Sequence, residues 1–290
     1  MDAANPTWHD LTLPAPTPVR ARLHTPASDA NGLVIRGGWL VWAHGGSWQY
    51  GSAADWHPVT QRLAGLSGWR VLSVDYRLAP AHRHPAVLED VLTAVDWARA
   101  RAGEDGLPLA VGGDSAGATL AASAALADRD RDRDRPAGAR TPLAAQVLAY
   151  PPLDPSCSAA GYHRDPDVFP RPAELRRAWR ALRCSAPPPT EPVGTEAPGT
   201  GPVRYLTPLD APDLRHVPPA VLAVGGLDPV ADDVLAYADR LRAADVPVDL
   251  IHPPGVAHAD LLRPDSHLLP RLAEHLRALG PVPHRTESAS

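Results

Sequence analysis

The sequence of 290 residues contains no lysine, so arginine supplies all 28 of its basic residues. With 33 acidic residues the formal net charge is -5, which gives no electrostatic reason to expect binding to nucleic acid or to an anionic membrane. No apolar run reaches the roughly 20 residues that span a bilayer. The first ten residues also lack the basic start and apolar core of a secretory signal. We therefore expect a soluble cytoplasmic protein that binds small molecules.

Cysteine is also scarce. The two cysteines, Cys157 and Cys184, both lie in the irregular middle of the chain, where they could approach one another. Two cysteines in a protein without a secretory leader are usually free thiols. We therefore do not expect a structural disulfide.

Strand and helix patterns alternate along most of the chain. Continuous apolar runs are typical of strands buried on both faces, and the segments between them have apolar residues at helical spacing. This order predicts one domain, residues 1–290, with a mostly parallel sheet covered by helices on both faces. Strands are expected at 39–43, 69–76, 109–113, 143–150, 220–224 and 248–252, and helices at 58–66, 87–103, 116–126, 172–182, 232–243 and 266–279.

Five segments depart from this alternation. Residues 11–13 and 19–24 are expected to be edge strands, because the prolines around them cannot donate to a central ladder. Residues 128–135 alternate aspartate with arginine and are interpreted as a solvated surface. The segment 154–216 is irregular, and long irregular segments are often functional covers or disordered, so we expect a lid with a mobile part over 185–203. The last residues, 281–290, are expected to form a disordered tail.

A G-x-S-x-G pattern, Gly113-Asp-Ser-Ala-Gly117, stands between a predicted buried strand and an alanine-rich helix. At such a turn the serine backbone is strained, and small neighbours let the strand and the helix approach one another. The serine Oγ is then exposed at the end of the sheet. Ser115 is therefore the candidate nucleophile, and the adjacent Asp114 is interpreted as structural.

A serine hydroxyl needs an imidazole to take its proton and a carboxylate to orient that imidazole. Asp228 follows one predicted strand and His258 follows the next. Because the carboxyl ends of parallel strands meet at one edge of a sheet, the three side chains can converge there. The competing residues are interpreted as a helix start (Asp232 and Asp233), a packed or edge position of a strand (His252) and a helix surface (His267 and His275).

Attack on an ester carbonyl creates an oxyanion, which N–H groups must stabilise. The N–H that follows the nucleophile belongs to Ala116, and the loop after residue 43 offers Gly45 and Gly46, which have no Cβ in the way. We predict an oxyanion hole from these three residues. Trp48, Tyr50 and Phe169 are candidate substrate contacts, although an aromatic residue is more often part of the core.

Five motifs together resemble the hormone-sensitive-lipase-like group of α/β-hydrolases, which includes microbial carboxylesterases and acetyl hydrolases. They are His44-Gly-Gly-Ser-Trp48, Asp75-Tyr-Arg-Leu-Ala-Pro80, Gly113-Asp-Ser-Ala-Gly117, Asp228-Pro-Val-Ala-Asp232 and Gly255-Val-Ala-His258. The resemblance covers most of residues 39–262. It implies the α/β-hydrolase fold, a Ser115–Asp228–His258 triad, an oxyanion hole from Gly45, Gly46 and Ala116, no cofactor or metal, and esters with fairly short acyl groups.

The sequence also departs from the family pattern. Ser47 replaces the third glycine of the family's HGGG, Ala81 replaces a usual glutamate, and Ala259-Asp260 stands where Gly-Phe is common. These changes leave the expected triad intact but affect the substrate range. The amino-terminal part is short for a helical cap, so covering the site is expected to fall to the lid segment.

We therefore predict a carboxylesterase-type serine hydrolase that cleaves small esters through an acyl-enzyme. The same side chains could instead serve acyl transfer, lactone formation or opening, an elimination, or amide hydrolysis. A catalytically silent small-molecule receptor is a further alternative, although such relatives lack a triad member and this chain has all three. The sequence leaves open whether the protein forms a homodimer.

Overall fold

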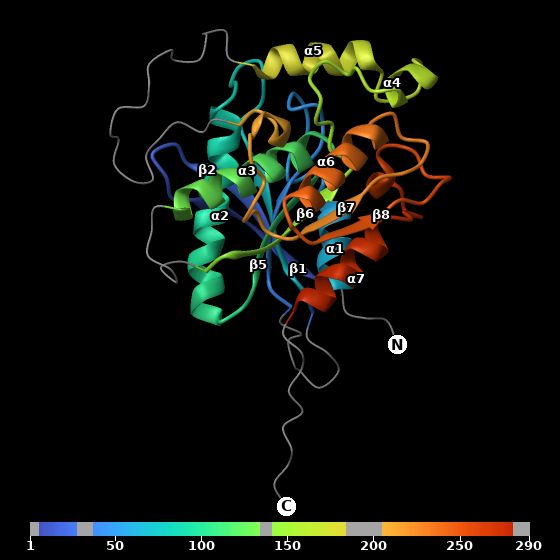
Figure 1. Ribbon diagram of the computed structural model, residues 1–290. Coiled ribbons are helices and arrows are strands. Elements are labelled where there is room, and N and C mark those ends of the chain that lie inside the picture. The colour runs from blue at the N-terminus through green and yellow to red at the C-terminus, as the bar shows by residue number, and fades with distance from the viewer. Residues whose placement is uncertain (1–5, 28–36, 134–140, 184–204, 281–290) are drawn as a thin grey trace, which may run out of the picture.

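The computed structural model describes residues 6–27, 37–133, 141–183 and 205–280 (Figure 1). Eight strands form one sheet in the order β1-β2-β4-β3-β5-β6-β7-β8. The first two strands pair antiparallel, β2 is also antiparallel to β4, and every other neighbouring pair is parallel. The predicted mostly parallel sheet is confirmed. The strands are β1 (Thr7–Leu13), β2 (Val19–Thr25), β3 (Trp39–Ala43), β4 (Arg70–Asp75), β5 (Leu109–Asp114), β6 (Leu143–Ala149), β7 (Ala220–Ala223) and β8 (Val248–Ile251).

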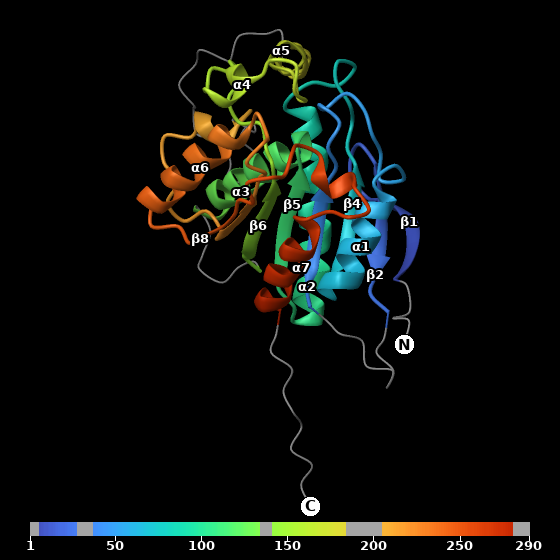
Figure 2. The same cartoon turned by 90° about the vertical axis from the view of Figure 1, so that its right-hand side faces the viewer.

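Helices cover both faces of this sheet. α1 and α7 lie side by side over one face, and α2 packs beside α3 over the other (Figure 2). Their apolar faces close a core in which β3 and β5 are buried along their whole length, as is typical of parallel strands. None of the described helices is both long and apolar enough to cross a membrane. The main helices are α1 (His57–Ser67), α2 (Ala86–Asp105), α3 (Ala116–Arg133), α6 (Ala231–Ala243) and α7 (Leu269–Leu279).

The first two strands differ from the prediction in one respect. β1 is an edge strand, but β2 lies between β1 and β4, so the prediction of an edge position is wrong for residues 19–24. The prolines explain the difference. Pro14, Pro16 and Pro18 stand in the turn that joins the two strands, where they remove no hydrogen bond from the ladder.

The alternating segment that begins at Asp128 also differs from the prediction. α3 continues to Arg133, and the Asp128 side chain is 5% exposed. Its Oδ2 accepts a hydrogen bond of 2.6 Å from a guanidinium NH2 of Arg99 on α2, whose side chain is 7% exposed. The interpretation as a solvated surface is therefore wrong at this end of the segment. Residues 134 and 135 lie outside the described residues.

Above the carboxyl ends of the strands stand two further helices, α4 (Gly161–Arg164) and α5 (Pro172–Leu182) (Figure 1). α5 occupies the range predicted for it, whereas α4 was not predicted. Cys157, just before α4, is a buried free thiol, and burial raises its pKa to about 12. Cys184, the expected mobile part 185–203 and the expected tail 281–290 lie outside the described residues.

Candidate active site

Ser115 forms the turn between β5 and α3. Its φ of 49° lies in the left-handed region, which residues other than glycine rarely adopt. A Cβ on Gly113 would lie 2.5 Å from the carbonyl oxygen of Ala43, and a Cβ on Gly117 would lie 2.0 Å from the same oxygen. The two glycines are therefore what allows β3, β5 and α3 to meet at this turn, as the sequence pattern indicates.

The structure brings Ser115, His258 and Asp228 together from three loops. Ser115 Oγ lies 3.0 Å from His258 Nε2, and His258 Nδ1 lies 2.8 Å from Asp228 Oδ2. The other carboxylate oxygen, Oδ1, accepts the N–H of Val230 at 3.0 Å. Because Asp228 can only accept when it is ionised, His258 Nδ1 carries the proton, and Nε2 is free to accept the proton of the serine. His258 is 8% exposed and Asp228 is 2% exposed, so both are shielded from water.

Two aromatic rings hold the imidazole of His258. The ring of Tyr150 lies 4.7 Å from it, centroid to centroid, and the ring of Phe169 lies 5.3 Å away in an edge-to-face arrangement. Tyr150 is fully buried, and its hydroxyl accepts the N–H of Leu261 at 3.3 Å. Phe169, in contrast, is 56% exposed. Of the three aromatic residues proposed from the sequence as substrate contacts, Phe169 is the one that touches His258.

Trp48 and Tyr50 lie in different surroundings. Trp48 is fully buried, its indole N–H donates to the Ala116 carbonyl at 2.9 Å, and its ring lies 4.3 Å from that of Trp179 on α5. It is therefore a core residue that joins α5 to the start of α3. Tyr50 is 70% exposed. The sequence does not predict the contact with Trp179, because spacing within α5 shows that one face of the helix is apolar but not which residues that face covers.

The backbone N–H groups around Ser115 correct one prediction. The N–H of Gly45 donates to Asp114 Oδ1 at 3.2 Å, so it is not available to an oxyanion. Among the described residues, the N–H groups of Gly46 and Ala116 have no such partner. Ala116 begins α3, where the first N–H groups lack intrahelical acceptors. Two turn hydrogen bonds, from the N–H groups of Gln49 and Tyr50 to the Gly46 carbonyl, hold the loop.

Asp114 organises this region. Besides the N–H of Gly45, its Oδ1 accepts the indole N–H of Trp56 at 2.9 Å and that of Trp42 at 3.2 Å. Burial raises the pKa of Asp114 to about 6, although these hydrogen bonds oppose the shift. The structural interpretation of Asp114 therefore fits. The two tryptophans carried no signal in the sequence, because their indole N–H groups converge only in the folded chain.

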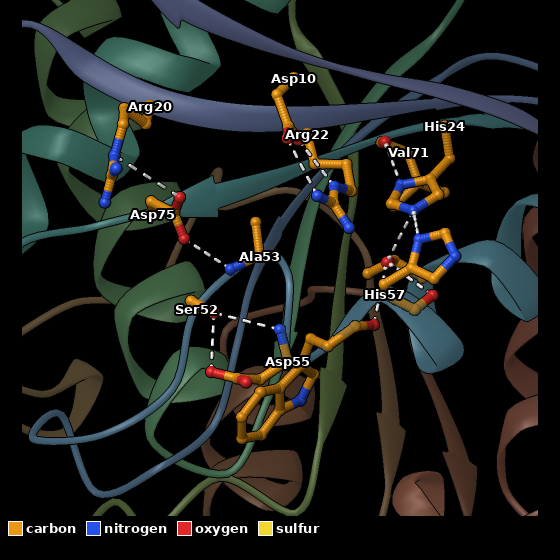
Figure 3. A network of polar contacts seen from close by, with 12 residues as sticks. Asp10, Arg20, Arg22, His24, Ser52, Ala53, Asp55, His57, Val71 and Asp75 are labelled. Carbon is orange, nitrogen blue, oxygen red and sulfur yellow. Dashed lines mark hydrogen bonds and ion pairs between the residues drawn. The ribbon is translucent and has the colours of Figure 1, made fainter.

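Polar contacts fix the loop that carries Trp56 (Figure 3). The N–H of Ala53 donates to Asp75 at the end of β4, and Ser52 Oγ donates to Asp55 at 2.7 Å. At the end of the loop, His57 Nδ1 lies 3.0 Å from Nε2 of the buried His24 on β2. Burial lowers the pKa of His24 to about 4 and also lowers the pKa of His57, so this contact joins two neutral imidazoles at neutral pH.

Asp232 and Asp233, the alternatives considered for the acid, hold the segment before and within α4. Asp233 Oδ2 accepts the Tyr162 hydroxyl at 2.7 Å and the N–H groups of Leu153 and Asp154 at 2.8 and 2.9 Å. Asp232 Oδ2 accepts the N–H of residue 161 at 2.6 Å. Both acids also stand in the first turn of α6, as the sequence suggests. Within the described ranges, no three histidine, cysteine, aspartate or glutamate side chains are placed to hold a metal ion.

The fold is that of an α/β hydrolase. A family model described as "alpha/beta hydrolase fold" matches residues 40–262, and the chain belongs to this family, in its hormone-sensitive-lipase-like esterase group. Carboxylic ester hydrolase LipN of Mycobacterium tuberculosis is 35% identical over 263 residues, which cover 87% of this chain but 64% of LipN, less than two thirds of that protein. The ethyl acetate hydrolase of Pseudomonas putida is 32% identical over 252 residues, 83% of this chain and 71% of that enzyme. The crystal structure of esterase LipW from Mycobacterium marinum matches with a TM-score of 0.76 at 27% identity, over 94% of this chain and 82% of LipW.

Proposed function

We propose that this chain is a serine carboxylesterase that hydrolyses small esters through an acyl-enzyme. The observation that supports this most directly is the chain of hydrogen bonds from Ser115 Oγ through the His258 imidazole to Asp228. Such a relay is what makes a serine hydroxyl nucleophilic at neutral pH. The names of the two curated relatives, an ester hydrolase and an ethyl acetate hydrolase, agree with a small ester as substrate.

In the proposed first step, Ser115 Oγ attacks the ester carbonyl carbon while its proton moves to His258 Nε2. The carbonyl oxygen becomes an oxyanion, which the N–H groups of Gly46 and Ala116 stabilise. Asp228 stabilises the imidazolium that forms. When the carbon–oxygen bond of the ester breaks, His258 returns the proton to the leaving alcohol and the acyl group stays on Ser115.

Water completes the cycle by the same route. His258 takes a proton from water as the hydroxyl oxygen attacks the acyl carbonyl, and the proton then returns to Ser115 Oγ as the acid leaves. The segment 154–216, whose described part carries α4 and α5, is proposed to cover this reaction as a lid. The contact between the rings of Trp48 and Trp179 supports that role, because it places α5 against the start of α3, which follows Ser115.

Two serine variants test the proposal, one at Ser115, just before α3, and one at Ser123, within α3. Ser115→Ala should lower turnover of p-nitrophenyl acetate and butyrate by about 10⁶-fold. Ser123→Ala is the matched control, because Ser123 is buried in α3 and its hydroxyl has no partner among the described residues. A fluorophosphonate probe should label the wild-type chain and the control but not Ser115→Ala. Near-normal turnover by folded Ser115→Ala would refute the proposal.

A further inference from the structure

The two aromatic rings that contact His258, those of Tyr150 and Phe169, differ in their exposure to solvent. Tyr150 is closed off in the core, whereas Phe169, which comes just after α4, exposes 56% of its surface. Its ring meets the imidazole at an interplanar angle of 67°. It is also the only phenylalanine in the chain. A molecule that approaches His258 from solvent on this side must therefore pass an apolar ring.

A cavity of about 400 Å³ lies beside this part of the chain: Phe169 and His258 do not line it, but their neighbours in sequence do. Val168, which precedes Phe169, lines it from the lid segment, and Leu227 and Ala257 line it from the loops that carry Asp228 and His258. Leu227 is 61% exposed. Three charged residues, Arg164, Asp165 and Asp228, also border the cavity. The Arg164 guanidinium lies 3.2 Å from Asp232 Oδ1, and Asp228 Oδ2 lies 2.8 Å from His258 Nδ1. Arg164 therefore already has a carboxylate partner within the chain.

The chemistry of the proposed reaction tells which part of an ester lies here. His258 Nε2 gives its proton to the oxygen of the leaving alcohol, so that oxygen must lie within hydrogen-bond reach of Nε2. The alcohol portion of the ester therefore begins next to the imidazole, where Phe169 contacts the ring. The acyl portion is held on the other side of the carbonyl carbon, which is bonded to Ser115.

From this geometry, and resting on the proposed esterase activity, we propose that Phe169 and the adjoining cavity form the binding surface for the alcohol portion of the substrate. The surface offers an aromatic ring and aliphatic side chains, which favour alkyl and aryl alcohols over polyols or charged alcohols. Phe169 is then a specificity-determining residue on the leaving-group side. It acts by contact with the substrate and takes no part in proton transfer.

Two series of esters separate a contact with the alcohol portion of the substrate from a contact with the acyl portion and from a general effect on His258. In the first series the acyl group is acetyl and the alcohol varies among methyl, butyl, phenyl and 2-hydroxyethyl. In the second the alcohol is methanol and the acyl group lengthens from acetyl to hexanoyl. Because loss of the ring next to His258 could slow all esters equally, the quantity compared is a ratio of kcat/KM values within each series.

For the wild-type chain we expect butyl and phenyl acetate to be preferred over 2-hydroxyethyl acetate. Phe169→Ala should lower the butyl-to-methyl ratio by about tenfold, as is usual when apolar contacts to one part of a substrate are lost. Phe169→Leu keeps an apolar side chain and should retain most of the wild-type butyl-to-methyl ratio. Leu227→Asn brings a polar group into the cavity and should lower this ratio. None of the three should shift the ratios of the acyl series. Leu66→Ala serves as the matched control, since Leu66 is an exposed apolar residue on α1.

The inference is overturned if the alcohol ratios of Phe169→Ala and Leu227→Asn equal those of the wild-type chain. It is also overturned if the acyl ratios shift by the same factor as the alcohol ratios. In both cases the wild-type chain still cleaves esters, so the esterase assignment survives. A wild-type chain that cleaves no member of either series overturns both.

Discussion

The carboxylate of Asp114 accepts the backbone N–H of Gly45 across a distance of 3.2 Å. This hydrogen bond ties the residue before the proposed nucleophile to the loop that carries the proposed oxyanion donor Gly46. Trp42 and Trp56 donate to the same oxygen, so β3, this loop and the start of α1 meet at one buried group. We therefore propose that Asp114, which is buried, positions the loop that carries Gly46.

Removal of this carboxylate should disturb the reaction more than the binding of substrate. Asp114→Ala leaves three N–H donors without their acceptor, and each such buried group costs about 1–3 kcal/mol. We expect kcat for p-nitrophenyl acetate to fall by about 10²-fold, as for loss of an oxyanion donor, while KM changes little. Asp114→Asn keeps an acceptor oxygen and should be less impaired.

The comparison of the two variants decides whether Asp114 acts in this way. Affinity for a boronic acid that mimics the tetrahedral intermediate should fall in Asp114→Ala in proportion to kcat. If the asparagine and alanine variants lose the same activity, or if inhibitor affinity is unchanged, the positioning role is wrong.

Asp114 should also make stability depend on pH. Burial raises its pKa from the usual 3.8 to about 6, so the folded chain binds this proton more tightly than the unfolded chain. Its contribution to stability is therefore fully present below about pH 4 and is lost as the pH rises through 6. Asp114→Asn lacks this dependence. Denaturant unfolding at pH 4.5 and pH 7 should show the wild-type chain losing roughly 2 kcal/mol relative to the variant between these values.

Among the described residues, the other buried carboxyl group with a raised pKa is Asp233, whose pKa burial raises to about 6. It is present in both proteins, so its effect cancels in the difference. A difference in unfolding free energy that does not change with pH would contradict the prediction for Asp114.

Much of the fold can be predicted from the sequence because each strand or helix is marked by a pattern of neighbouring residues that continues over its whole length. β3 and α5 have the limits predicted for them. The five apolar residues of β3 end at a histidine, and α5 begins at Pro172. The meeting of Ser115, Asp228 and His258 follows from the order of parallel strands, since each side chain stands just beyond a carboxyl end.

The remaining features depend on contacts between distant segments, which no local pattern records. Whether the N–H of Gly45 faces Asp114 or the site is decided by backbone angles and by the position of β5. Asp128 looks like a surface residue in its repeat until Arg99 of α2 is placed beside it. α4 has four residues, too few for apolar periodicity to show.

Asp228→Asn should remove most of the proposed activity while the fold persists. If the asparagine keeps its oxygen on the N–H of Val230, its amide N–H faces His258 Nδ1 and forces the proton onto Nε2. Nε2 then cannot accept the proton of Ser115, and kcat should fall by about 10⁴-fold with KM little changed. Steady-state kinetics on p-nitrophenyl acetate measures this. Asp239→Asn, at an exposed position of α6, should behave like the wild-type chain, and an Asp228→Asn variant within tenfold of wild type would rule out the assigned tautomer.

Two ion pairs in the region of the alternating repeat should differ in their effect on stability. Asp128→Ala leaves the buried Arg99 without one of its partners, and breaking a buried pair costs about 3–5 kcal/mol. We expect the lower end of that range, because Arg99 keeps Asp96 at 2.8 Å. Arg131→Ala breaks a longer and more exposed contact of 3.4 Å to the same Asp96, which should cost at most about 1 kcal/mol. Denaturant unfolding of the two variants under identical conditions measures both values, and equal losses would show that burial of Asp128 does not set the strength of its pair.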